Sequence, residues 1–263
     1  MELNLTGKRA FVSGSTQGIG YAIARALLAE GASVVINGRD ETRVRQAERA
    51  LARDVPGATV SGLVADFADA DQVARLLASL GDIDILVNNV GLFEVAAFES
   101  IDDATWQRYF DVNVMSSVRL SRHVLPGMLA SGAGRILFIS SESGVNVPAD
   151  MVHYGMTKAA VLAISNGLAK LTRGTEVTVN TILGGPTYSD GVAGAVEAIA
   201  TSQGMPADDL KSLIESANQT SLLQRFIRPD EIANLAVYLA SPRASATNGA
   251  AVRADGGVLT AVL

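Results

Sequence analysis

The feature that most constrains the fold is an alternation of strand-like and helix-like segments from the first residues almost to the last. Short apolar runs, typical of strands buried on both faces, are followed by segments with helical spacing of apolar residues. This alternation predicts an α/β protein with a single-domain Rossmann fold, a doubly wound parallel sheet with helices on both faces. The expected strands are residues 9–13, 33–37, 59–65, 83–88, 135–140, 177–183 and 250–253, and the expected helices are residues 18–30, 41–52, 72–80, 105–129, 154–173 and 231–239.

Residues 187–219 interrupt this alternation. The segment has no strand signal, mixes small and polar residues, and contains Gly191, Gly194, Gly204 and Pro206. An insertion of this length in a compact domain is typically a lid or binding element. We therefore expect a substrate lid here, with a passive surface loop as the alternative. Because no linker or internal repeat divides the chain, we expect residues 1–263 to form one domain.

Composition excludes several classes of function. The 263 residues include 48% apolar residues, no cysteine and two histidines, with a net charge of −6. The absence of cysteine excludes disulfides, thiolate metal sites and cysteine nucleophiles, and two histidines argue against a multi-histidine metal site. A mildly acidic chain lacks the charge that attracts nucleic acid. Without a basic leader or an uncharged apolar run of about 18 residues, we expect no membrane segment and a cytoplasmic protein.

A glycine-rich loop lies between the first expected strand and the first expected helix. Glycine permits a tight turn and a close approach of a phosphate to the backbone, and the free N–H groups of the following helix attract that phosphate. A tight strand-to-helix turn without a ligand is the alternative. The surrounding β-α-β pattern favours a dinucleotide pyrophosphate site. Its expected cofactor contacts are Gly14, Ser15, Gln17, Gly18, Ile19 and Gly20.

The end of the second expected strand bears on the choice of cofactor. A carboxylate there would bind the adenosine ribose of NAD(H), whereas an arginine can neutralise the 2′-phosphate of NADP(H). The sequence has Gly38 and Arg39 at this point, and Asp40 suits the N-cap of the next helix. We therefore favour NADP(H), with NAD(H) as the alternative if Arg39 is only a surface charge.

Tyr154 and Lys158 are spaced so that both side chains lie on one face of an expected helix. Such spacing is common on helix surfaces, but Ser141 stands at the carboxyl end of the preceding expected strand, where parallel α/β sheets bind ligands. A lysine ammonium near tyrosine favours the tyrosinate, so we expect a lowered pKa for Tyr154. The serine hydroxyl could bind the same carbonyl oxygen that the tyrosine protonates.

Over essentially its whole length the sequence resembles the short-chain dehydrogenase/reductases. The resemblance rests on the glycine loop, Asp66, residues 88–91, Asn113, Ser141, Tyr154, Lys158, residues 185–187 and the motifs at 248–249 and 255–257. It implies Tyr154 as general acid–base, Ser141 as the group that positions the substrate oxygen, Lys158 on the nicotinamide ribose and Asn113 in a proton relay. The same resemblance implies that Tyr154, Lys158, Asp66, Asn89, Gly91, Thr187 and Ser189 also contact the cofactor.

The sequence departs from the pattern of the family at three points. Val90 replaces the usual alanine, Gly184 replaces the usual proline, and Ser15 and Gln17 stand where a basic residue often helps to bind a 2′-phosphate. The last departure weakens the case for NADP(H).

The function we expect is hydride transfer between NADP(H) and a carbonyl or secondary alcohol, by a homotetramer or homodimer without a metal. A 3-oxoacyl-thioester reductase is the alternative enzyme, and a catalytically idle dinucleotide-binding sensor is the alternative of another class.

Overall fold

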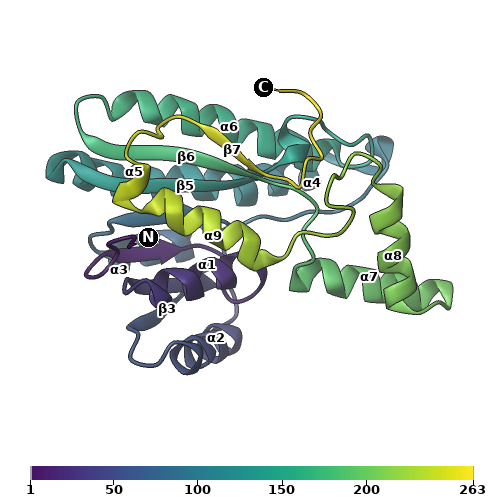
Figure 1. The fold of residues 1–263 in the computed structure, drawn as a ribbon, viewed down its shortest axis with the longest axis horizontal. Helices are drawn as coiled ribbons and strands as arrows, with labels where there is room; N and C mark the ends of the chain where they lie inside the picture. Colours follow the sequence, from purple (N-terminus) through teal and green to yellow (C-terminus); the bar gives the residue numbers. More distant parts are fainter. Residues whose placement is uncertain (1, 263) are drawn as a thin grey trace.

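A computed structural model describes residues 2–262, and all of its strands belong to one parallel sheet (Figure 1). The strand order is β3-β2-β1-β4-β5-β6-β7, so the chain runs outward in one direction and then in the other. This arrangement confirms the predicted doubly wound fold. The strands are β1 (Arg9–Val12), β2 (Ser33–Gly38), β3 (Val60–Val64), β4 (Ile85–Asn88), β5 (Ala133–Ser141), β6 (Glu176–Gly184) and β7 (Ala251–Ala254).

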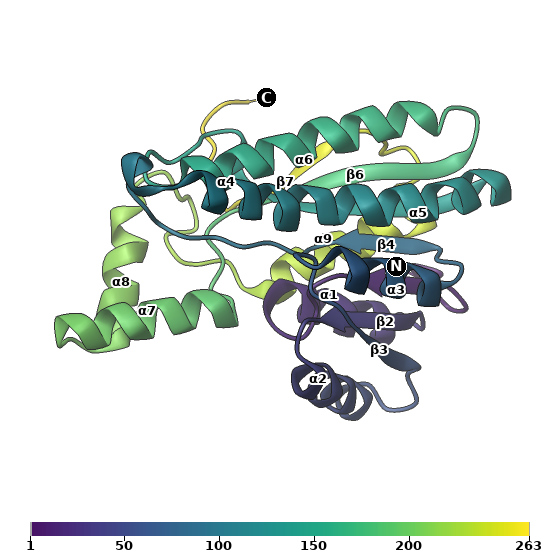
Figure 2. The ribbon, with the colours of Figure 1, turned by 180° about the vertical axis from the view of Figure 1, so that it is seen from behind.

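Two apolar cores, one on each face, hold helices against the sheet. Side chains of a buried strand alternate between the cores, so that Ala10 and Val12 join one core while Phe11 joins the other. One face is covered by α1 (Gly18–Ala29), α2 (Glu41–Asp54) and α9 (Pro229–Ala240). The other is covered by α3 (Ala70–Leu80), α5 (Ser116–Ser131) and α6 (Val152–Leu171), as Figure 2 shows from behind.

The single helix expected over residues 105–129 is divided into three parts. The structure has α4 (Asp103–Tyr109), a π-helical turn η2 (Phe110–Met115) and then α5. A π turn remains helical and differs from an α-helix in its hydrogen-bond pattern, which the residue types alone do not reveal. The π turn contains Asn113, one of the expected site residues.

Residues 187–219 contain two helices, α7 (Asp190–Gln203) and α8 (Ala207–Ala217). Both project from the body of the molecule at one end of the sheet (Figures 1 and 2). The remaining short elements are the 3-10 turns η1 (Phe98–Ser100), η3 (Glu142–Gly144) and η4 (Pro242–Ala244).

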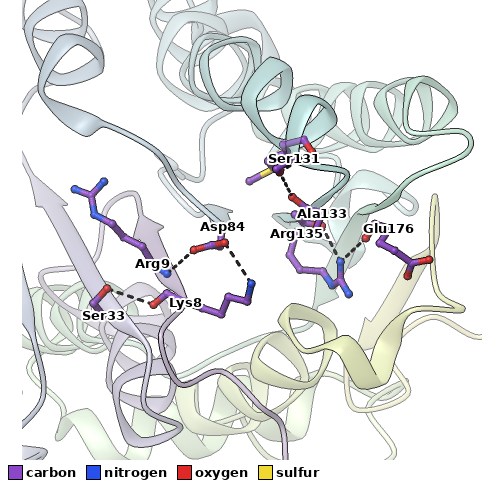
Figure 3. Close-up of polar contacts among 10 residues, drawn as sticks. Lys8, Arg9, Ser33, Asp84, Ser131, Ala133, Arg135 and Glu176 are labelled. Carbon is purple, nitrogen blue, oxygen red and sulfur yellow. Dashed lines mark hydrogen bonds and ion pairs between the residues drawn. The ribbon is translucent and has the colours of Figure 1, made fainter.

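Polar side chains at the amino ends of the strands tie the sheet together (Figure 3). Asp84 accepts hydrogen bonds from the Arg9 N–H at 2.9 Å and from Lys8 Nζ at 3.4 Å. The buried guanidinium of Arg135 donates to three backbone oxygens, those of Gly134, Glu176 and Ser241. These charged groups already have protein partners, so this edge stabilises the fold and leaves the opposite edge for ligands.

Candidate active site

A cleft of about 630 Å³ lies at the carboxyl ends of the strands, where the strand order reverses between β1 and β4. Parallel α/β sheets bind their ligands at this point. The cleft is lined by the glycine loop, by the ends of β2, β3 and β4, and by the start of α7. Of the expected cofactor contacts, it brings together Gly14, Gln17, Gly18, Ile19, Arg39, Asp66, Asn89, Gly91 and Ser189.

The glycine loop has the shape that a pyrophosphate requires. Gly14 and Gly18 both have a positive φ of 61°, and Gln17 provides no side-chain cap for α1. The first-turn N–H groups of a helix lack partners within the helix, so those of α1 other than the Gly18 N–H, which has a side-chain partner, are available to an anion. Asn89 donates to the carbonyl oxygens of Ser13 and Gly14 at 3.0 and 2.8 Å, which fixes the loop against β4. The cleft therefore fits a dinucleotide.

Five of the expected contacts do not line this cleft. Tyr154 and Lys158 lie beside it, and Ser15, Gly20 and Thr187 have structural roles. Ser15 is fully buried, donating to the Val12 oxygen at 2.7 Å and accepting from the Asn37 N–H at 3.0 Å. A Cβ on Gly20 would lie 2.5 Å from the oxygen of Gly14, so glycine there allows close packing of α1. Thr187 is buried and donates to the Gly185 oxygen at 2.8 Å.

The end of the cleft beside β2 is lined by two arginines and by Asp40. Arg39 and Arg43 both line it, together with Thr16. Arg43 was not predicted from the sequence; it lies in the first turn of α2, four residues after Arg39, which precedes the helix. Asp40 caps α2 by accepting from the Arg43 N–H at 2.8 Å, as expected. Two arginines at one end of a dinucleotide cleft suit a phosphate better than a ribose hydroxyl.

Ser141, Tyr154 and Lys158 lie together at the carboxyl end of β5. Lys158 Nζ donates to the Ile139 oxygen at 2.9 Å and lies 5.4 Å from the centroid of the Tyr154 ring. The hydroxyl of Ser141 lies close enough to that of Tyr154 to lower its pKa. Gly91 is next to this group, because a Cβ there would lie 3.4 Å from Lys158 Nζ. The structure thus brings the three expected catalytic side chains together beside Gly91, which lines the cleft.

Burial dominates the ionisation of this group. It raises the pKa of Tyr154, the Ser141 hydroxyl opposes the rise, and the Glu142 carboxylate adds to it. Burial also lowers the pKa of Lys158 to about 8, against the opposing effect of Glu142. The expected lowering of the Tyr154 pKa by Lys158 is therefore wrong for this arrangement. The ammonium of Lys158 points to the Ile139 oxygen. The raising of the Tyr154 pKa by burial outweighs any lowering by the charge of Lys158.

Asn113 is adjacent to the same group, but its side chain is fully engaged. Its Nδ2 donates to the Leu92 oxygen at 2.9 Å and to Thr157 Oγ1 at 3.0 Å, and its Oδ1 accepts from the Leu92 N–H at 2.7 Å. The side chain thereby connects the loop after β4 to α6. A role for Asn113 in a proton relay stays a prediction.

Two acidic residues that the sequence analysis did not single out lie at the site. Glu142 folds back onto Ser141 and Ser143. Asp190, the first residue of α7, accepts a hydrogen bond from the Gly18 N–H at 2.6 Å. The second contact places a carboxylate on the first turn of α1, where a pyrophosphate would bind. No local pattern signals it, because the two residues are 172 positions apart.

Two classes of site are not found. No helix in the described part of the chain is long and apolar enough to cross a membrane. Within residues 2–262 no cluster of three or more histidine, aspartate or glutamate side chains could hold a metal ion.

Comparison with known proteins agrees with the fold and the cleft. The sequence profile of a family described as enoyl-(acyl carrier protein) reductase matches residues 14–259. An uncharacterized oxidoreductase of Bacillus subtilis, YvrD, is 46% identical, with 98% of this chain and 99% of that protein covered. D-beta-hydroxybutyrate dehydrogenase of Cupriavidus necator is 35% identical over 96% of this chain and 98% of its own length.

A solved structure of L-sorbose reductase from Gluconobacter frateurii, complexed with NADPH and L-sorbose, superposes with a TM-score of 0.92. It is 32% identical, and all of both chains is covered. The chain therefore belongs to the short-chain dehydrogenase/reductase superfamily. It is an oxidoreductase of the class that acts on alcohol and ketone groups, and its cleft is that of a nicotinamide dinucleotide enzyme.

The contact between Asp190 and Gly18 leads to a prediction about cofactor affinity. The carboxylate competes with the pyrophosphate for one backbone N–H and also repels it. We expect Asp190→Asn to lower the dissociation constant for NADPH by about tenfold, the order of one charge-assisted hydrogen bond. Calorimetric titration with NADPH measures this change. Asp208→Asn, which removes an acid from the first turn of α8, is the control and should change it less than twofold. Weaker binding by Asp190→Asn would contradict the prediction.

Proposed function

We propose that this protein is an NADP(H)-dependent reductase or dehydrogenase that interconverts a ketone and a secondary alcohol, with Tyr154 as the general acid–base. The observation that carries the proposal is the convergence of Ser141, Tyr154 and Lys158 beside Gly91, next to the dinucleotide cleft. This arrangement of a serine, a tyrosine and a lysine suits proton transfer to a carbonyl oxygen better than metal-dependent or nucleophilic hydrolysis.

In reduction, the bound nicotinamide supplies a hydride to the carbonyl carbon. Ser141 and Tyr154 hold the carbonyl oxygen by hydrogen bonds, and Tyr154 donates its proton as negative charge develops there. The raised pKa of Tyr154 keeps the hydroxyl protonated at neutral pH, which suits a proton donor. Lys158 remains an ammonium below its pKa of about 8 and stabilises the tyrosinate that is left.

The preference for NADP(H) is supported by Arg39 and Arg43 at the ribose end of the cleft. The solved structure of the L-sorbose reductase is a complex with NADPH. That of a protein described as an NAD(P)-dependent gluconate 5-dehydrogenase from Beutenbergia cavernae has bound NADP. The exposed position of both arginines keeps them free to meet a phosphate, and the guanidinium fork matches its geometry.

A 3-oxoacyl-thioester reductase is the second candidate. It is favoured by 30% identity to the 3-oxoacyl-[acyl-carrier-protein] reductase of Vibrio harveyi over 97% of this chain. Such a substrate presents its ketone to the same three side chains, so the two candidates differ only in what flanks the carbonyl.

A panel of ketones, keto sugars and acetoacetyl thioesters, followed by the absorbance of NADPH, tests the proposal. We expect turnover of at least one ketone without a thioester. Turnover of thioesters alone would favour the second candidate. Binding of NADPH without any turnover across the panel would instead indicate a dinucleotide-binding sensor.

The proposal also covers the lid, the assembly, the location and the partners of the protein. We propose that residues 187–219 form the substrate lid, because α7 starts at the cleft and contacts Gly18. We also propose a cytoplasmic homotetramer, or else a homodimer, that binds a small substrate and neither nucleic acid nor membrane. Light scattering tests the assembly, and a mass equal to the 27.3 kDa of one chain at every concentration would contradict it.

A further inference from the structure

The carboxylate of Glu142 is held beside Ser141 at the end of β5. Glu142 begins η3, and its side chain folds back so that the Ser141 hydroxyl donates to Oε2. The Ser143 N–H donates to the same oxygen at 2.9 Å, and Ser143 Oγ donates to Oε1 at 3.1 Å. Three donors therefore fix the position of this carboxylate within the catalytic group.

The negative charge of Glu142 is not neutralised by an ion pair. None of the ion pairs formed within residues 2–262 includes it. Its charge nevertheless reaches the two groups that flank the substrate, because it raises the pKa of both Tyr154 and Lys158. Because Glu142 accepts directly from the Ser141 hydroxyl, a substrate oxygen bound by Ser141 lies only one hydroxyl group away from this carboxylate.

We propose that Glu142 is a substrate-recognition residue that selects α-hydroxy ketones and the corresponding vicinal diols, an inference that rests on the function proposed above. A carboxylate accepts hydrogen bonds and donates none, so the fitting partner is a hydroxyl on the carbon next to the carbonyl. A carboxylate at that carbon, as in an α-keto acid, meets a like charge instead.

The hydrogen bonds of Ser141 link this recognition to catalysis. A serine hydroxyl has one proton, and here that proton is donated to Glu142. A substrate hydroxyl can replace the Ser141 hydroxyl as the donor to Glu142. The Ser141 hydroxyl is then free to donate to the carbonyl oxygen. The α-hydroxyl should therefore raise kcat as well as affinity, since it completes the group that binds the reacting oxygen.

Three small ketones with the same carbon chain test the proposal: hydroxyacetone, acetone and pyruvate. For the wild type we expect kcat/KM to be highest for hydroxyacetone. In Glu142→Gln, the hydroxyacetone-to-acetone ratio of kcat/KM should fall by about 10–100-fold, the loss of one charge-assisted hydrogen bond. The hydroxyacetone-to-pyruvate ratio should fall as well. Ratios within one protein cancel any general damage to the site.

Asp82→Asn is the matched control, because it removes one exposed acid at the opposite edge of the sheet and should leave both ratios unchanged. A change of less than threefold in both ratios for Glu142→Gln would overturn the proposal, as would a wild type that prefers pyruvate. Calorimetry with the NADP⁺ complex, which cannot reduce the ketones, gives ratios of dissociation constants, which report the effect of Glu142 on affinity alone. If the wild type turns over neither these three ketones nor any member of the wider panel but the binding ratios shift, the proposed function fails while the recognition by Glu142 stands.

Discussion

Replacement of Tyr154 by phenylalanine is expected to lower kcat by about 10²–10⁴-fold, the usual contribution of general acid–base catalysis. The substitution removes the hydroxyl that donates the proton and leaves the ring, which lies beside Lys158. The fold and the dinucleotide cleft should survive, since Tyr154 does not line the part of the cleft that would hold the adenosine and pyrophosphate. Steady-state kinetics of the most active ketone, with NADPH, measure the effect.

Tyr238→Phe is the matched control for that experiment. Tyr238 is a partly exposed residue of α9, so the loss of its hydroxyl should leave kcat within twofold of the wild type. The dissociation constant for NADPH should be the same in both variants. Activity of Tyr154→Phe within about threefold of the wild type would show that another group donates the proton.

Arg39→Leu is expected to reduce the preference for NADPH over NADH by about 10–150-fold in kcat/KM. This range corresponds to the loss of one charge-assisted, bidentate contact to the 2′-phosphate, worth about 1.5–3 kcal/mol. Since Arg43 lines the same end of the cleft, the double variant with Arg43→Leu should lose more of the preference than either single variant. The kcat/KM for NADH should change little, because NADH has no phosphate at this position.

Arg45→Leu is the control. Arg45 belongs to α2, as Arg43 does, but it does not line the cleft and pairs with Glu48 at 3.2 Å. A carboxylate at position 38, which would bind the ribose hydroxyls of NADH, is a less suitable test than Arg39→Leu. A Cβ on Gly38 would lie 2.6 Å from the Thr16 side chain and 3.1 Å from that of Val44. A wild type with equal or higher kcat/KM for NADH would mean that Arg39 is a surface charge. The missing basic residue at Ser15 or Gln17 would then be the more informative sign.

The parts of the molecule that could be predicted from the sequence depend on local patterns. The strands and most helices follow from apolar periodicity, and the glycine loop from its place between a strand and a helix. The approach of Tyr154 and Lys158 follows from helical spacing, and that of Ser141 from the rule that ligands bind at the carboxyl ends of parallel strands. Because these rules act over a few residues, one sequence suffices to apply them.

The parts that could not be predicted depend on contacts between distant segments or on how one side chain turns. Whether Ser15 faces the cleft or the β1–β2 contact is decided by the hydrogen bond to Asn37. The raised pKa of Tyr154 depends on how many groups bury it, and the contact of Asp190 with Gly18 depends on where α7 packs. Glu142 is adjacent to Ser141 in sequence, yet only its folded-back side chain marks it as part of the site.

The central claim is that hydride passes between the nicotinamide and a carbonyl carbon held by Ser141 and Tyr154. The most direct measurement uses NADPH that carries deuterium at the transferable position, together with a ketone that the enzyme reduces, and determines the mass of the alcohol product. We expect the wild type to form an alcohol that carries one deuterium on its former carbonyl carbon. Tyr154→Phe should form much less of this labelled alcohol. An unlabelled alcohol, or oxidation of NADPH without formation of an alcohol, would contradict the central claim.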